Sequence, residues 1–132
     1  MYIRRSPQGA AGFLLLLVLA VLLLTACGSA ARLEGHWVDD TRSLTLGDAV
    51  FTIGYPAGGA VSALRGEYRR YRNRLELVFT DWQDSDGTWN SVEGTDLDGH
   101  REFLQFRFEK DELVTVAEHS GRTFRYRRLA AP

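Results

Sequence analysis

The sequence predicts an all-β domain after residue 34, namely a small up-and-down antiparallel β-barrel. Apolar and polar residues alternate with a period of two in several short segments, which is the pattern of half-buried strands. Turn-forming residues separate these segments at hairpin spacing. No long window in this part of the chain holds a helical apolar stripe. A small β-sandwich is the alternative architecture.

Residues 1–26 have the three parts of a secretory signal. Arg4 and Arg5 form a positive n-region, and an uninterrupted apolar run follows from Phe13 to Leu24. The segment Leu24-Thr25-Ala26-Cys27 resembles the lipobox of bacterial lipoproteins position by position. That resemblance implies a signal helix that is removed before Cys27, and acylation of this cysteine by a diacylglyceryl group and often by palmitate.

An uncleaved membrane anchor over residues 10–26 is the alternative. That apolar stretch lies near the lower limit of about 17 residues for a membrane span, whereas an apolar core of about 7–15 residues fits a signal better. Both interpretations place the domain outside the cytoplasm and hold it at the membrane. Gly28 occupies the position where many Gram-negative lipoproteins carry the Asp that retains them at the inner membrane. The resemblance therefore implies the outer membrane in a Gram-negative host.

The sequence divides into the signal, a lipidated Cys27 with a spacer to residue 33, and one domain over residues 34–132. Cleavage removes two basic and no acidic side chains, so the net charge changes from −1 to about −3. This mild balance favours solubility over any class of partner. Cys27 is the only cysteine, so disulfides and sulfur-based zinc sites are not expected.

The strands are expected in the following order. A first strand opens at Gly35-His36-Trp37, and later strands follow at 44–46, 51–53, 75–80, 104–109 and 123–127. Hairpin turns are expected at Gly47-Asp48, Arg72-Asn73, Lys110-Asp111 and Ser120-Gly121. Roughly eight short strands joined in this way favour a closed barrel, because closure removes unpaired edges.

Gly35-x-Trp37 is similar to the Gly-x-Trp that opens the first strand of lipocalins and of shorter bacterial lipocalin-like domains. Gly66-Glu67-Tyr68, followed by Asn73 to Leu77, resembles a strand, turn and strand of those short domains. The resemblance implies that Trp37 packs across the closed end of the barrel, beneath the cation of Arg127 or Arg128. A core role for Trp37 in another small β fold is the alternative.

Residues 81–98 are rich in acidic side chains and contain no Lys or Arg. Asp84, Asp86 and Glu93 fall on liganding positions of a calcium loop, but Trp82 occupies the first such position and no helices flank the segment. We therefore expect a long solvated loop and no metal or other cofactor. Trp82 and Trp89 would either form a lid over the barrel mouth or anchor the loop by packing.

Two groups of basic residues flank this stretch, and both contain aromatic residues. They are Arg65, Arg69, Arg70, Arg72 and Arg74, and Arg122, Arg125, Arg127 and Arg128. Nucleic acid is not an expected partner for an exported, net-acidic domain. Lipid headgroups are one alternative, and a wet strand face paired with Glu67, Glu76 and Glu118 is the preferred one.

No nucleophile motif or metal-ligand spacing is present, so an enzyme is not expected. Two functions remain. In the first, a lipid-anchored, lipocalin-like barrel binds a small apolar or amphipathic ligand. In the second, a filled barrel acts as an interaction scaffold of the cell envelope. An interior wholly filled by aromatic and leucine side chains would count against the first; the residues concerned are Phe51, Leu77, Phe79, Phe106, Phe108 and Phe124.

Overall fold

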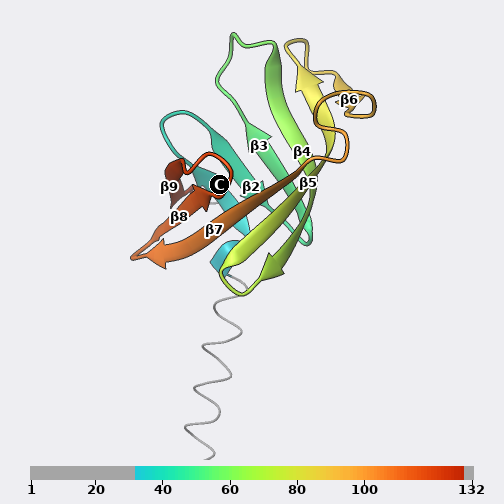
Figure 1. Ribbon diagram of the computed structural model, residues 1–132. Coiled ribbons are helices and arrows are strands. Elements are labelled where there is room, and N and C mark those ends of the chain that lie inside the picture. The colour runs from blue at the N-terminus through green and yellow to red at the C-terminus, as the bar shows by residue number, and fades with distance from the viewer. Residues whose placement is uncertain (1–31, 130–132) are drawn as a thin grey trace, which may run out of the picture. The chain divides into compact units, whose positions relative to one another are not determined.

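A computed structural model describes residues 32–129, and within them a nine-stranded antiparallel sheet closes into a barrel (Figure 1). The expected signal helix, Cys27 and most of the spacer lie outside the described residues. Within the described part of the chain, no helix has the length and apolar character needed to span a bilayer.

Eight strands form the closed ring, in which each strand pairs with the one before it and the one after it when β6 is left out. The ring runs β1–β2–β3–β4–β5–β7–β8–β9 and closes where β9 pairs with β1. The short β6 lies outside the ring and pairs with β5. This confirms the all-β, up-and-down antiparallel barrel and excludes the sandwich. The strands are Gly35–Val38, Ser43–Leu46, Val50–Gly54, Val61–Tyr71, Arg74–Asp84, Trp89–Ser91, Arg101–Glu109, Glu112–Ala117 and Thr123–Arg128, numbered β1 to β9.

The four expected turns all connect neighbouring strands. The β4–β5 and β7–β8 hairpins turn at Arg72-Asn73 and Lys110-Asp111, as expected. Arg72 and Lys110 adopt φ angles of 54° and 55°, the left-handed conformation that tight hairpin turns require. Ala49 in the β2–β3 turn has a φ of 59° for the same reason. Local turn chemistry therefore fixes the order of the strands.

Gly66 is the point at which the long strands β4 and β5 approach each other most closely. The pairing register shifts between Arg65 and Gly66, where Thr80 of β5 has no partner on β4, so β5 carries a β-bulge there. A Cβ atom at this position would overlap the carbonyl oxygen of Val78 and lie 3.0 Å from Cε1 of Phe51. Glycine is therefore required where the backbones of β4 and β5 come this close.

The acidic segment is not one long loop, and this corrects the expectation for residues 81–98. β5 continues to Asp84, and β6 pairs with it from Trp89 to Ser91. The turn between them is stabilised by Gly87, whose φ is 85° and whose N–H donates to the carbonyl of Asp84 at 3.1 Å. Backbone pairing with β5 thus overrides the loop-like composition, and only residues 92–100 form a connection of their own.

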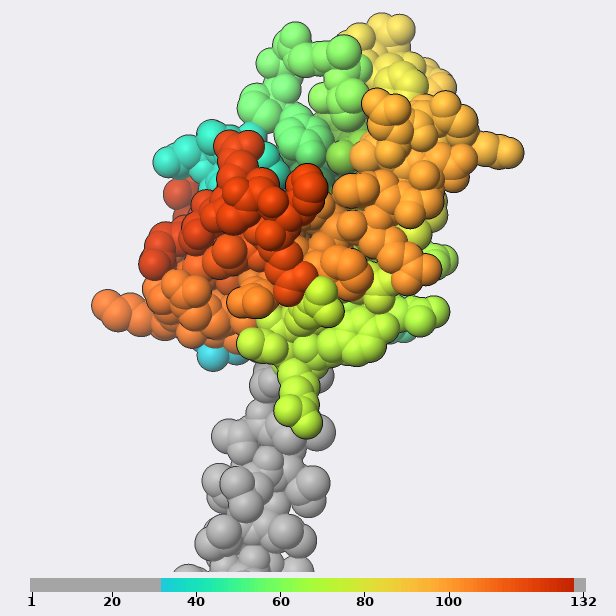
Figure 2. All heavy atoms as spheres, in the orientation of Figure 1, coloured from blue at the N-terminus to red at the C-terminus, as the bar shows by residue number. Residues whose placement is uncertain are grey.

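The barrel has two unlike ends. The hairpin turns at 47–49, 72–73 and 110–111 lie at one, which we call the closed end, where Trp37, Phe106 and Phe108 pack together. We call the opposite end the mouth. The strands are connected there by the segments 39–42, 55–60, 92–100 and 118–122. Figure 2 shows the β3–β4 loop, in green, at the end away from the β4–β5 hairpin, in yellow-green.

Candidate functional site at the barrel mouth

The closed end is sealed by Trp37, Gly35 and Arg128. Arg128, not Arg127, lies over the indole of Trp37, with its guanidinium carbon 4.4 Å from the ring centroid. Arg128 Nη1 also donates to the carbonyl oxygen of Glu34 at 2.9 Å. Gly35 has a φ of 144°, and a Cβ there would lie 2.5 Å from Arg128 Nη1. The absence of a side chain at Gly35 therefore makes room for the cation that covers Trp37.

The half of the barrel toward the mouth is not filled. A cavity of about 270 Å³, here called the inner cavity, lies among side chains from six strands and the loops beside them. Leu77, Phe79 and Phe124 line it, whereas Phe51 and Phe106 pack as buried residues and are not part of its wall. The remaining lining residues are Arg42, Leu44, Ile53, Tyr55, Glu102, Leu104, Thr115, Ala117, Ser120, Arg122 and Tyr126.

Four polar residues of the cavity wall lie near the mouth. Each is two positions away from an inward-facing apolar residue, so it lies on the same side of the strand. Arg42 precedes the inward Leu44 by two residues, and Arg122 precedes the inward Phe124 by two. Glu102 precedes Leu104, and Tyr55 follows Ile53, at the same spacing. These four residues, Arg42, Tyr55, Glu102 and Arg122, are called the mouth group below.

Phe124 supports both cations of the mouth group. The guanidinium of Arg42 lies 4.0 Å from the centroid of Phe124 and 5.4 Å from that of Tyr55. The guanidinium of Arg122 lies 5.5 Å from the Phe124 centroid. Arg122 is exposed, as expected for a residue of this basic group, and it also borders the cavity. A cation over an aromatic face is stabilised by the ring quadrupole.

Two further hydroxyl groups line the cavity wall. Burial raises the pKa of Tyr126 to about 12, although Arg42 and Thr115 oppose part of that shift. Tyr126 therefore stays protonated at neutral pH and can donate a hydrogen bond. Thr115 Oγ1 is buried and makes no hydrogen bond of normal geometry to another described residue.

Glu102 gives the cavity one negative side chain. His100 Nε2 lies 3.4 Å from its Oε2, and the His100 ring stacks on Phe79 with centroids 6.1 Å apart. Phe79 in turn meets Phe51 edge to face at 5.5 Å. Phe79 thus separates the packed closed end from the polar mouth.

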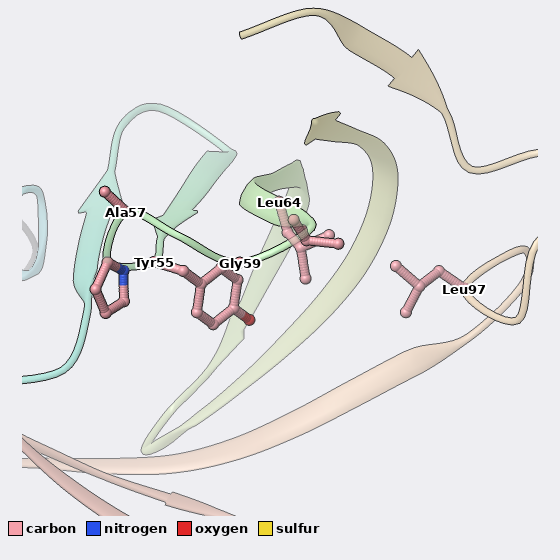
Figure 3. Close-up of a pocket in the computed structure, with 7 residues that line it drawn as sticks. Tyr55, Ala57, Gly59, Leu64 and Leu97 are labelled. Carbon is pink, nitrogen blue, oxygen red and sulfur yellow. The ribbon is translucent and has the colours of Figure 1, made fainter. Parts of the chain in front are cut away.

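An open apolar hollow of about 570 Å³ lies beside the inner cavity and shares Tyr55 with it. The β3–β4 loop supplies Pro56, Ala57 and Gly59, and Leu97 comes from the connection before β7. Figure 3 shows Leu97 pointing across this hollow toward Tyr55 and Leu64. The mouth of the barrel is therefore bordered by apolar side chains outside the mouth group.

Trp82 and Trp89 lie in neither hollow. Trp82 is half-buried in β5, opposite Leu64 of β4 and Asn90 of β6. The ring of Trp89 is covered by the guanidinium of Arg65, 4.0 Å from its centroid. Arg65 also pairs with Asp81 at 3.2 Å. The two tryptophans are thus built into the β5–β6 hairpin instead of forming part of the cavity wall.

The three candidate calcium ligands are not brought together. Asp84 accepts hydrogen bonds from the N–H groups of Asp86 and Thr88 at 2.9 and 3.1 Å, so it holds the hairpin turn. Glu93 lies beyond β6. Over residues 32–129, no group of three His, Cys, Asp or Glu side chains has an arrangement able to hold a metal ion.

Asp84 provides a testable pH dependence. The hydrogen bond from Thr88, with those from Asn90 and Asp86, holds the pKa of Asp84 below its usual 3.8. Since the folded pKa is lowered, its contribution to stability is present above pH 3.8 and is lost as the pH falls through the folded pKa. We expect a carbon-detected NMR titration to place the Asp84 midpoint below 3.8; a midpoint at or above this value would contradict the turn geometry.

Several charged side chains outside the cavity form ion pairs with residues from other segments. Arg74 pairs with Glu118 at 2.6 Å, and Arg101 pairs with the buried Glu76 at 2.6 Å. Arg125 bonds to Glu109 on β7. Arg74 and Arg125 thus belong to a solvent-exposed strand face with paired charges, as expected, and Glu118 is a predicted acidic partner that pairs with Arg74.

Comparison with known proteins identifies no relative. No family model matches the chain, and no curated protein and no solved structure is significantly similar to it.

Proposed function

We propose that this chain is a non-enzymatic, extracytoplasmic lipoprotein whose lipocalin-like barrel binds a small apolar or amphipathic molecule at its mouth. The inner cavity carries this proposal. Its wall is mainly aliphatic and aromatic, and a few polar groups converge at one end, which is the usual composition of a small-molecule site. The volume of about 270 Å³ lies just below the range of about 300–1,000 Å³ that is typical of ligand pockets.

Glu34 opens the barrel at its closed end. Glu34 accepts from Arg128 at the closed end, so the chain enters the barrel at the end opposite to the mouth. An acyl group on Cys27 would precede this entry point by a short spacer.

Replacing Cys27 by alanine tests the lipid anchor. We expect the wild-type chain, expressed in a Gram-negative host, to incorporate an alkyne-labelled palmitate and to fractionate with the outer membrane. The Cys27→Ala variant should incorporate no label, because the acylated thiol is gone. Gly28→Asp is the matched control and should keep the label. Equal labelling of Cys27→Ala would contradict the lipoprotein assignment.

Native mass spectrometry of the full chain, purified from its own membranes, tests ligand binding. A co-purifying small molecule that is lost when the inner cavity is filled by Ala117→Leu would support the proposal. If wild type and variant both carry no such molecule but capture the same envelope proteins, the scaffold function is favoured instead. The packed closed end, with Trp37 and Phe106 buried, is the part of the barrel that would suit a scaffold.

A further inference from the structure

Arg42 and Arg122 differ from the arginines on the outer face of the barrel in their electrostatic partners. Arg65, Arg74 and Arg125 each pair with a carboxylate. Neither Arg42 nor Arg122 forms such an ion pair within residues 32–129, although both line the inner cavity. In the described part of the chain, neither guanidinium thus has a carboxylate within ion-pair distance, although Asp39 interacts with Arg42 electrostatically.

Arg42 also carries a buried donor that is unused. Its Nε is buried and has no hydrogen-bond partner in the described part of the chain. A buried donor of a charged group without an acceptor is costly. The guanidinium carbon of Arg42 lies 4.0 Å from the centroid of Phe124. A guanidinium can contact an aromatic face and still donate from its N–H groups to an oxyanion.

We propose that Arg42 and Arg122 bind the oxyanion headgroup of a small amphipathic acid whose apolar tail lies in the inner cavity. This inference rests on the proposed ligand-binding function and names its ligand class. Tyr126 would supply a neutral donor to the same headgroup. The tail would contact Leu77, Phe79 and Leu104, which line the deeper wall.

The other charges near the site set limits on the headgroup. Asp39 is already engaged, because its Oδ1 accepts from the N–H groups of Thr41 and Arg42 at 2.6 and 2.7 Å. Glu102 opposes an anion from β7, so the headgroup is expected on the Arg42 side of the cavity. One negative against two positive side chains leaves the cavity lining net positive.

The cavity volume limits the size of the ligand. Each water molecule takes about 30 Å³ in the liquid, so about 270 Å³ accommodates about nine non-hydrogen atoms. Medium-chain carboxylates are of this size, whereas a diacyl phospholipid is far larger. A longer single chain would have to extend into the open hollow beside Tyr55.

Equilibrium dialysis of the full lipidated chain in phospholipid nanodiscs tests the inference, with empty nanodiscs as the blank. The probes are octanoate, octyl phosphate and 1-octanol, which share one tail. We expect at least one anion to bind about tenfold more tightly than the alcohol, the difference that a charge-assisted hydrogen bond provides. Comparison of the two anions distinguishes a carboxylate from a phosphate ligand.

Arg42→Gln and Arg122→Gln should each weaken anion binding about tenfold and leave 1-octanol binding unchanged. Arg125→Gln, on the same strand as Phe124 but facing outward, is the matched control and should change neither. Glu102→Gln should strengthen anion binding. Circular dichroism verifies that each variant is folded, and Arg122→Gln remains informative if Arg42→Gln is not.

Three outcomes are distinguishable. If the alcohol binds as tightly as both anions, or if the cavity arginine variants behave like Arg125→Gln, the headgroup assignment is wrong while the apolar cavity still binds. If none of the three probes binds above the blank, both this inference and the proposed function fail. Selective, arginine-dependent anion binding supports both.

Discussion

Replacing Gly66 with alanine is expected to prevent stable closure of the barrel. The added Cβ would overlap the Val78 carbonyl oxygen and lie 2.9 Å from its carbon, and neither belongs to a flexible side chain that can move away. Relieving this overlap requires β4 and β5 to separate where they pair. We expect a loss of about 3 kcal/mol or more in the free energy of unfolding, at the upper end of the range for overpacking.

Urea unfolding followed by circular dichroism measures this loss. Gly59→Ala is the matched control, because the nearest atom to a Cβ there is the Val61 carbonyl oxygen at 3.5 Å, an ordinary van der Waals contact. The control should unfold within about 0.5 kcal/mol of the wild type. If Gly66→Ala is as stable as Gly59→Ala, the tight approach of β4 and β5 at Gly66 is refuted.

Replacing Trp37 with alanine is also expected to lower the free energy of unfolding strongly. Trp37 is 1% exposed, contacts Phe108 with ring centroids 6.1 Å apart, and carries Arg128 over its face. Truncation leaves a cavity at the closed end and removes the aromatic partner of a cation. The expected cost is about 3–5 kcal/mol, which lowers the melting temperature by more than about 10 °C for a domain of this size.

Trp89→Ala provides the comparison, since Trp89 is half-buried and its ring is covered by Arg65 on the outer hairpin. Its loss should cost about 1 kcal/mol. Thermal unfolding of the two variants under identical conditions measures the difference. Equal melting temperatures would show that Trp37 does not seal the closed end.

The two ends of the barrel therefore differ in packing and in polarity. The closed end derives its stability from Trp37, Gly35 and Arg128, which fit together because Gly35 has no side chain. The mouth keeps polar groups that serve no evident structural purpose, among them the unused Nε of Arg42. Two other buried atoms of the described residues also have no hydrogen-bond partner, Thr115 Oγ1 in the cavity wall and Arg74 Nε on the outer face, so two of the three lie at the mouth.

The strand pattern could be predicted because it is local. Alternation in Leu75 to Phe79 and in Leu104 to Phe108 follows from the two-residue period of an extended chain. The turns at Arg72-Asn73 and Lys110-Asp111 follow from the preferences of the residues within them. Trp37 was placed under an arginine by resemblance, and the structure puts Arg128 in that position.

The mouth group was missed although the sequence carries a signal for it. Arg42, Glu102 and Arg122 each lie two residues before an inward-facing apolar residue, so the period of two would place their side chains on the same face. At the end of a strand, however, a charged residue in the inward phase is ordinarily solvated. Whether such a residue faces a cavity depends on how far the neighbouring strands extend, and no local pattern reports that extent.

The β class and the positions of the turns could be read from the sequence, because each depends on residues close together in the chain. The pairing of β6 with β5, the close approach of β4 and β5 at Gly66, and the contact of both Arg42 and Arg122 with Phe124 required the folded structure. These features arise from pairing and packing between distant segments, where the geometry of closure, and not local preference, fixes which side chains meet.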